Sequence, residues 1–117
     1  MDLAKAIGTH QDYKLRLSLW VMTGAGPVMN PETCGRDDRC ELGQWILGEG
    51  SERFGGTPEL AGLKAIHTQF HRCAGSVIRA VLDGHAAEAQ KLLERDLFPL
   101  STEVVVAINS MKVIAGQ

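Results

Sequence analysis

His67 and His71, one helical turn apart, are the residues of this chain whose types and spacing are best suited to chemistry. At positions i and i+4, both side chains project from one helical face. Two imidazole nitrogens can then reach one metal ion at about 2.0–2.1 Å. With Cys40 and His10 they make up three imidazoles and one thiolate, a donor set typical of a closed tetrahedral zinc site. Convergence of all four side chains would give a metal-binding domain.

Each of these residues also has a simpler interpretation, which the sequence leaves open. His67 and His71 lie at the edge of an apolar stripe, where polar residues are common. His10 lies within such a stripe, and a lone histidine there is more often a hydrogen-bonded core residue than a ligand. Free cysteine is among the most buried residue types. Cys40 falls in the first turn of an expected helix, where the helix dipole favours the thiolate that zinc binds.

Thr68 argues against a zinc protease. The motif of such enzymes is His-Glu-x-x-His, in which the Glu acts as general base. Here Thr68 occupies the Glu position and cannot take that role. Four protein ligands would also leave no coordination position for an activated water. We therefore expect a protein without enzymatic activity.

Helices must position these residues, because apolar residues recur at spacings of three and four. The first helix begins at Leu3 and ends at Gly24, and a loop follows over residues 24–36. Asp37 or Asp38 is expected to cap a short second helix that ends near Gly48. The apolar stripe of the first helix contains Leu3, Ala6, His10, Tyr13, Leu17 and Trp20.

Two further long helices follow a second loop. Thr57-Pro58 predicts the start of the third helix, and Asp83-Gly84 predicts its end. Pro99 predicts a kink in the fourth helix. The stripe of the third helix contains Leu63, Ile66, Phe70, Cys73, Val77 and Val81. The stripe of the fourth contains Ala89, Leu93, Leu97, Leu100, Val104, Ile108, Met111 and Ala115.

Three long helices and one short helix, each with a single apolar face, predict an all-α antiparallel four-helix bundle. Such a bundle would carry the metal site in its interior. The chain has 117 residues, which is enough for one domain, residues 1–117, and too few for two.

Composition narrows the function classes. The formal charge is −2, and the absence of a basic patch argues against nucleic acid as a partner. No apolar run approaches the ~20 residues of a membrane span. The N-terminus lacks the plan of a signal peptide, so we expect a cytoplasmic protein.

The other cysteines and the fourth histidine are expected to lie outside the metal site. The count of three cysteines argues against a disulfide framework. Cys73 is expected to pack in the core, and His85 to lie in a solvated turn. Cys34 is expected in an exposed loop, from which it could pair with an oxidised Cys40.

Three motifs together resemble the chemoreceptor zinc-binding domain family over nearly the whole chain. They are His10 with Tyr13, the run Cys40-Glu41-Leu42-Gly43-Gln44-Trp45, and His67-Thr68-Gln69-Phe70-His71. Tyr13 stands where Trp is more familiar in the family, and Cys34 is not part of its pattern. The resemblance implies a helical bundle that binds zinc through His10, Cys40, His67 and His71.

The resemblance also implies a function in bacterial signal transduction. It implies a homodimer that regulates a fused or associated output, such as a chemoreceptor signalling domain or a diguanylate cyclase. The family is linked to sensing zinc or oxidants such as hypochlorous acid, with the zinc-bound Cys40 thiolate as the oxidisable group.

Two other functions fit the same pattern of helices. One is a bundle protein that binds non-haem iron or oxygen, although a cysteine ligand favours zinc over non-haem iron. The other is a structural dimerisation bundle in which the histidines and cysteines are incidental. Apolar residues off the stripes would then form a dimer face or broaden the core. They are Leu15, Leu19, Met22, Val105 and Val106.

Overall fold

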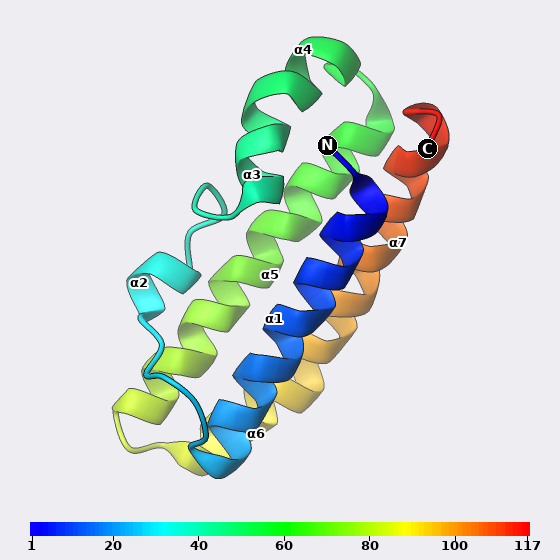
Figure 1. Ribbon diagram of the computed structural model, residues 1–117. Coiled ribbons are helices and arrows are strands. Elements are labelled where there is room, and N and C mark those ends of the chain that lie inside the picture. The colour runs from blue at the N-terminus through cyan, green and yellow to red at the C-terminus, as the bar shows by residue number, and fades with distance from the viewer.

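The computed structural model describes residues 1–117 and consists of helices, with no strand (Figure 1). The prediction of an all-α fold is therefore confirmed. The elements are α1 (Leu3–Thr23), α2 (Pro31–Cys34), α3 (Glu41–Trp45), the π-helical turn η1 (Ile46–Gly50), α4 (Ser51–Phe54), α5 (Pro58–Leu82), α6 (Ala86–Leu92), the π-helical turn η2 (Leu93–Leu97) and α7 (Phe98–Ile114).

Three long helices form the body of the domain (Figure 1). Helices α1 and α5 run in the same direction, and the continuous helix α6–η2–α7 runs in the opposite direction and packs against both. The short helices α3 and α4 lie along the first half of α5, and α2 lies beside its second half. The arrangement differs from a simple four-helix bundle. In place of a fourth long helix it has α3, η1 and α4, which are interrupted by a bend at Gly48, and α2 is an additional helix.

Signals at the helix ends account for these boundaries. The Asp2 side chain caps α1 by accepting a hydrogen bond from the Lys5 N–H, and Gly24 ends it with a left-handed φ of 73°. Thr57 caps α5 by accepting from the Leu60 N–H, and Pro58 occupies the first helical position. These predicted ends are confirmed. The predicted stop at Gly48 is not, because the chain bends there and continues helically to Phe54.

The last long helix buries most of the stripe that the sequence predicted, but Leu100 and Ala115 are only half-buried. Leu93, Leu97 and Val104 are buried as expected, but Ser101 is buried in the place assigned to Leu100. An ordinary α-helix has 3.6 residues per turn, so residues spaced four apart do not stay on the same face along its length but drift around the helix. The wider π turn Leu93–Leu97 offsets that drift. The irregularity expected at Pro99 therefore appears as a π turn just before it.

The expectation from the sequence that no apolar segment is long enough to span a membrane is wrong by length and composition. Ala86–Ile114 is a continuous helix of 29 residues that is long and apolar enough to cross a membrane by length and composition. Core helices of soluble proteins pass the same test. Here the helix buries Leu93, Leu97 and Ile108 within the domain core.

Candidate metal centre

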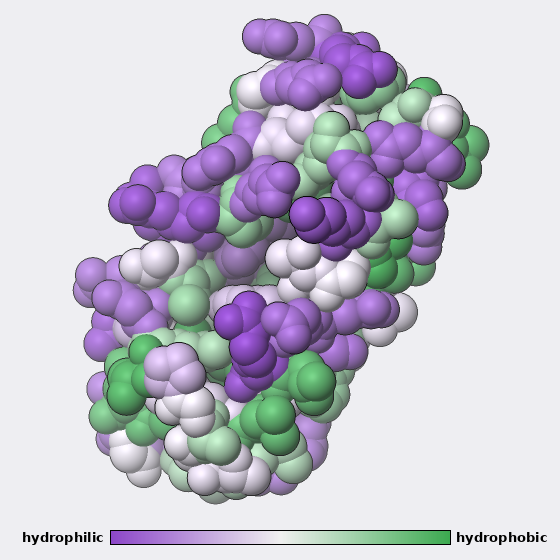
Figure 2. All heavy atoms as spheres, in the orientation of Figure 1, coloured by the Kyte–Doolittle hydropathy of each residue, from purple (hydrophilic) through white to green (hydrophobic).

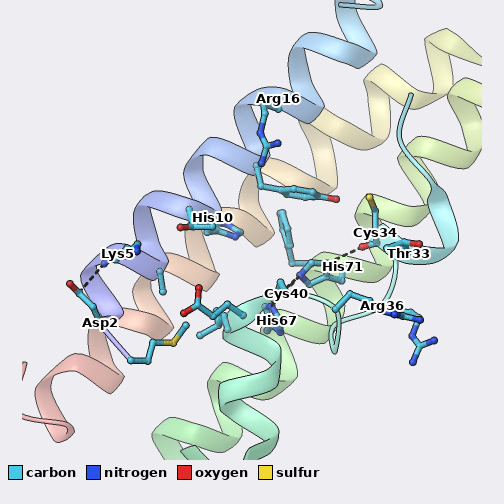
Figure 3. Close-up of a pocket in the computed structure, with 18 residues that line it drawn as sticks. Asp2, Lys5, His10, Arg16, Thr33, Cys34, Arg36, Cys40, His67 and His71 are labelled. Carbon is cyan, nitrogen blue, oxygen red and sulfur yellow. Dashed lines mark hydrogen bonds between the residues drawn. The ribbon is translucent and has the colours of Figure 1, made fainter. Parts of the chain in front are cut away.

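Cys40 begins helix α3 as its N-cap residue. Its backbone is extended (φ −93°, ψ 160°), and its Sγ accepts a hydrogen bond from the Gly43 N–H at 3.3 Å. The prediction that Asp37 or Asp38 caps this helix is wrong, because Asp38 pairs with Arg36 at 2.7 Å instead. The cap geometry directs the thiol toward α5 (Figure 3).

Gly43 allows the turn before α3 to pack tightly. A Cβ atom built on Gly43 would lie 1.6 Å from the Asp37 carbonyl oxygen and 3.2 Å from Cε1 of His67. Only a residue without a side chain fits between these two atoms. Gly43 therefore permits the backbone approach that brings Cys40 close to α5.

His67 and His71 lie on the buried face of α5, with 3 % and 8 % of their surface exposed. The prediction that they lie at the edge of the apolar stripe is wrong, because their helical face also carries Leu63, Phe70 and Ala74 into the core. The two Nε2 atoms are 3.1 Å apart. Sγ of Cys40 lies 3.3 Å from Nε2 of His67 and 3.7 Å from Nε2 of His71.

These separations match those of a tetrahedral metal site. Zinc binds imidazole nitrogen at about 2.0–2.1 Å and thiolate sulfur at about 2.3 Å. Tetrahedral angles then place two nitrogens about 3.3 Å apart, and nitrogen and sulfur about 3.6 Å apart. The three donor atoms of Cys40, His67 and His71 also lie within 4.8 Å of one another. One metal ion can therefore bind all three.

The histidines are held in the protonation state that a metal needs. Nδ1 of His71 lies 2.8 Å from the Cys34 carbonyl oxygen, which can only accept, so the Nδ1–H donates and Nε2 of the neutral ring keeps its lone pair. Burial, together with the neighbouring His71, lowers the pKa of His67 to about 4. Burial also lowers the pKa of His71. Both rings are neutral at pH 7.

The pKa of the Cys40 thiol differs from the expectation that a position at a helix N-terminus favours the thiolate. Burial raises its pKa, and the opposing effect of the N–H groups of Gly43 and Leu42 is smaller. The helix N-terminus alone therefore does not produce a thiolate. A bound cation would supply the missing stabilisation and displace the proton.

His10 lies on the other wall of the same cavity and does not join the cluster of three donors (Figure 3). Its Nε2 is hydrogen-bonded to Oγ of Ser101 on α7 at 2.8 Å, and 8 % of its surface is exposed. The Phe70 ring packs against it, with the ring centroids 4.5 Å apart. Burial lowers the pKa of His10 to about 4, so its ring is neutral. These contacts are those of a core histidine, and its role as fourth ligand stays a prediction.

A cavity of about 370 Å³ reaches the cluster from the surface. It is lined by His10, Cys40, His67 and His71, and also by Cys34 and Tyr13. The buried hydroxyl oxygen of Tyr13 has no hydrogen-bond partner in the structure. The cavity therefore gives small molecules access to the Cys40 sulfur.

Sequence reasoning missed two contacts around the cluster. Ser101 is the partner of His10, and its signal was a spacing of four from Leu97 in the apolar stripe. Asp37 and Thr68 hydrogen-bond across 31 residues at 2.5 Å, and no local pattern indicates that contact.

The helices and this donor set define an all-helical protein with a site able to hold a metal ion. The model of the chemoreceptor zinc-binding domain family matches residues 10–78, which include His10, Cys40, His67 and His71. The chain belongs to this family. No curated protein and no solved structure matches the chain.

Proposed function

We propose that this protein is a non-enzymatic zinc-binding regulatory domain of bacterial signal transduction. The observation that carries the proposal is the agreement between the Cys40, His67 and His71 donor distances and tetrahedral zinc geometry. A thiolate with imidazoles favours zinc over non-haem iron, which usually binds carboxylates and histidines. Membership of a zinc-binding family supports the same metal.

In this proposal His10 is the fourth ligand. It lines the same cavity as the other three residues, and its ring is neutral. To bind the metal it exchanges its hydrogen bond with Ser101 for coordination. Four protein ligands would close the site, so the metal would not activate water for hydrolysis.

Zinc would couple the first part of the chain to α5. His10 is on α1, Cys40 begins α3, and the histidine pair is on α5, so one ion would tie three helices together. Structural zinc sites contribute roughly 10–16 kcal/mol of apparent binding free energy that is coupled to folding. Loss of zinc, or of one ligand, would loosen the contacts between these helices and so change the state of an attached output.

Cys40 is the ligand most open to chemical change. Its side chain is half-buried and lines the cavity, so an oxidant such as hypochlorous acid can reach its sulfur. Oxidation to sulfenic acid removes the thiolate character on which zinc binding depends. Membership of the chemoreceptor zinc-binding family supports this function. The output would be a chemoreceptor signalling domain or a diguanylate cyclase, and the location would be the cytoplasm.

A homodimer would cover the apolar residues that the fold leaves exposed. Leu15, Leu19 and Met22 share one exposed face of α1. Apolar residues gather on the surface near the end of α1, whereas hydrophilic residues cover much of the rest of this face (Figure 2). Gel filtration with light scattering tests the dimer, and a monomeric mass would contradict it.

The metal is tested by elemental analysis of the purified chain beside Cys40→Ala, with Cys73→Ala as the matched control. Cys73 is also a half-buried cysteine but belongs to no donor cluster. We expect one zinc per wild-type chain, the same content in Cys73→Ala, and less in Cys40→Ala. A tight chelator should lower the melting temperature of the wild type. Iron in place of zinc, or no metal at all, would refute the proposal.

The oxidant sensor is tested by mass spectrometry of the zinc-loaded chain after mild exposure to hypochlorous acid. We expect the first modification on Cys40. Modification of Cys34 or Cys73 with Cys40 intact would show that Cys40 is not the trigger.

A further inference from the structure

The segment between α2 and α3 is attached to α5 by two hydrogen bonds at the metal centre. At its start, the Cys34 carbonyl accepts a hydrogen bond from Nδ1–H of His71 at 2.8 Å. In its middle, a carboxylate oxygen of Asp37 accepts one from the Thr68 hydroxyl at 2.5 Å. Residues 36–39 make no other hydrogen bond to α5. Thr68 directly follows His67 along the helix.

We propose that Asp37 and Thr68 form a latch that positions the Cys40 thiol at the histidine pair and so sets both the zinc affinity and the reactivity of that thiol. The latch rests on the proposed zinc-binding function, because it acts through Cys40. Neither residue belongs to the donor cluster. Both are therefore positioning residues.

The backbone transmits the position of Asp37 to Cys40. The Asp37 carbonyl oxygen lies 4.0 Å from Sγ of Cys40. The same oxygen lies 1.6 Å from the position that a Cβ on Gly43 would take. Gly43 in turn donates its N–H to Sγ of Cys40. A shift of Asp37 away from α5 therefore moves both the sulfur and the N–H that orients it.

The chemistry of the contact makes it a strong hydrogen bond. A hydroxyl that donates to a carboxylate forms a shorter and stronger bond than one between neutral groups. The Thr68 hydroxyl also lies 2.9 Å from the Lys64 carbonyl oxygen, but its single hydrogen serves one acceptor at a time. Removing the hydroxyl would free Asp37 while the helix keeps its own backbone hydrogen bonds.

Without the Asp37–Thr68 hydrogen bond, the segment that carries Cys40 would become ordered only when the metal binds. The entropy lost in that ordering would reduce the zinc affinity. Loss of a hydrogen-bonded group that supports a metal ligand typically lowers metal affinity about 10–100-fold. The thiol would also spend more time away from the histidines in the metal-free protein. It would therefore react faster with an alkylating reagent.

The experiment compares the full chain carrying Thr68→Val, Thr68→Ser or Ser76→Ala with the wild type. Valine keeps the shape and removes the hydroxyl, whereas serine retains it. Ser76 is the matched control, because its hydroxyl bonds only to the Arg72 carbonyl of the same helix. The measurements are zinc affinity by competition with a chromophoric chelator, the alkylation rate of Cys40 in metal-free protein by peptide mass spectrometry, and the melting temperature.

We expect Thr68→Val to bind zinc about 10–100-fold more weakly and to be alkylated faster at Cys40, with Thr68→Ser and Ser76→Ala close to wild type. Wild-type affinity and alkylation in Thr68→Val would overturn the latch. Equal effects in Thr68→Ser, which retains the hydroxyl, would overturn it too. If the wild type bound no zinc, the proposed function would fail, whereas the alkylation rates would still decide the latch.

Discussion

Replacing Gly43 by alanine tests the geometry of the metal centre most directly. The new Cβ would lie 1.6 Å from the Asp37 carbonyl oxygen. Real Cβ atoms essentially never come closer than 3.0 Å to such a neighbour, so the two must separate by about 1.4 Å. The obstacle is backbone, which cannot rotate away as a flexible side chain can. The turn that carries Cys40 must therefore shift.

The size of the expected effect follows from this shift. Metal–ligand bonds tolerate displacements of only about 0.2 Å. The sulfur of Cys40 is bonded to the N–H of Gly43, so it follows the movement of the turn. We expect the zinc affinity to fall at least ~100-fold, or about 2.7 kcal/mol, at the upper end of the effects seen for supporting groups. Overpacking would also cost the metal-free fold roughly 1–3 kcal/mol.

The assay is a competition titration of zinc between the protein and a chromophoric chelator, beside thermal melts of the metal-free chain. Gly62→Ala is the matched control, because a Cβ at Gly62 in α5 meets nothing within 4 Å. Alanine there should leave the zinc affinity unchanged and stabilise the helix by about 0.5–1 kcal/mol. Wild-type affinity in Gly43→Ala would refute the close approach of Asp37 that this reasoning requires.

A Cβ on Gly75 would lie 3.0 Å from Cα of Gly35, so Gly75→Ala should push α2 away from α5. The free energy of unfolding, measured with urea, should fall by roughly 1–3 kcal/mol, and a variant as stable as wild type would contradict that packing. The pKa values of His10 and His67 fall from 6.5 to about 4 on folding, so the unfolded chain binds more protons in this range and stability decreases as the pH falls. The metal-free chain should lose about 2–3 kcal/mol per histidine between pH 7 and 4.5, and a flat urea-unfolding profile would contradict the burial of neutral rings. His10→Ala should weaken zinc binding. Ser101→Ala removes the hydrogen bond that His10 gives up on coordination, so it should not weaken zinc binding but should lower the stability of the metal-free chain by about 1–3 kcal/mol. Wild-type zinc affinity in His10→Ala would remove His10 from the ligand set.

Local signals in the sequence predicted most of the helical framework. The caps at Thr57 and Gly24 and the apolar stripe of α1 act within a few residues, and the structure has them where expected. The pair His67 and His71 was identifiable for the same reason, because a spacing of four fixes their common face in any helix. Cys40 could be added because its motif places it near a helix start.

Tertiary packing decided which atoms meet. Cys40 and His67 are 27 residues apart, Asp37 and Thr68 are 31 apart, and His10 and Ser101 are 91 apart. The sequence by itself determined the long helices, most of their buried positions and the set of donor types, since periodicity and capping are short-range effects. Only the folded structure decided that Cys40 caps its own helix, that three donors converge while His10 bonds to Ser101, and that Asp37 is bound by Thr68. Such contacts depend on how whole helices pack, and no pattern within one helix encodes them.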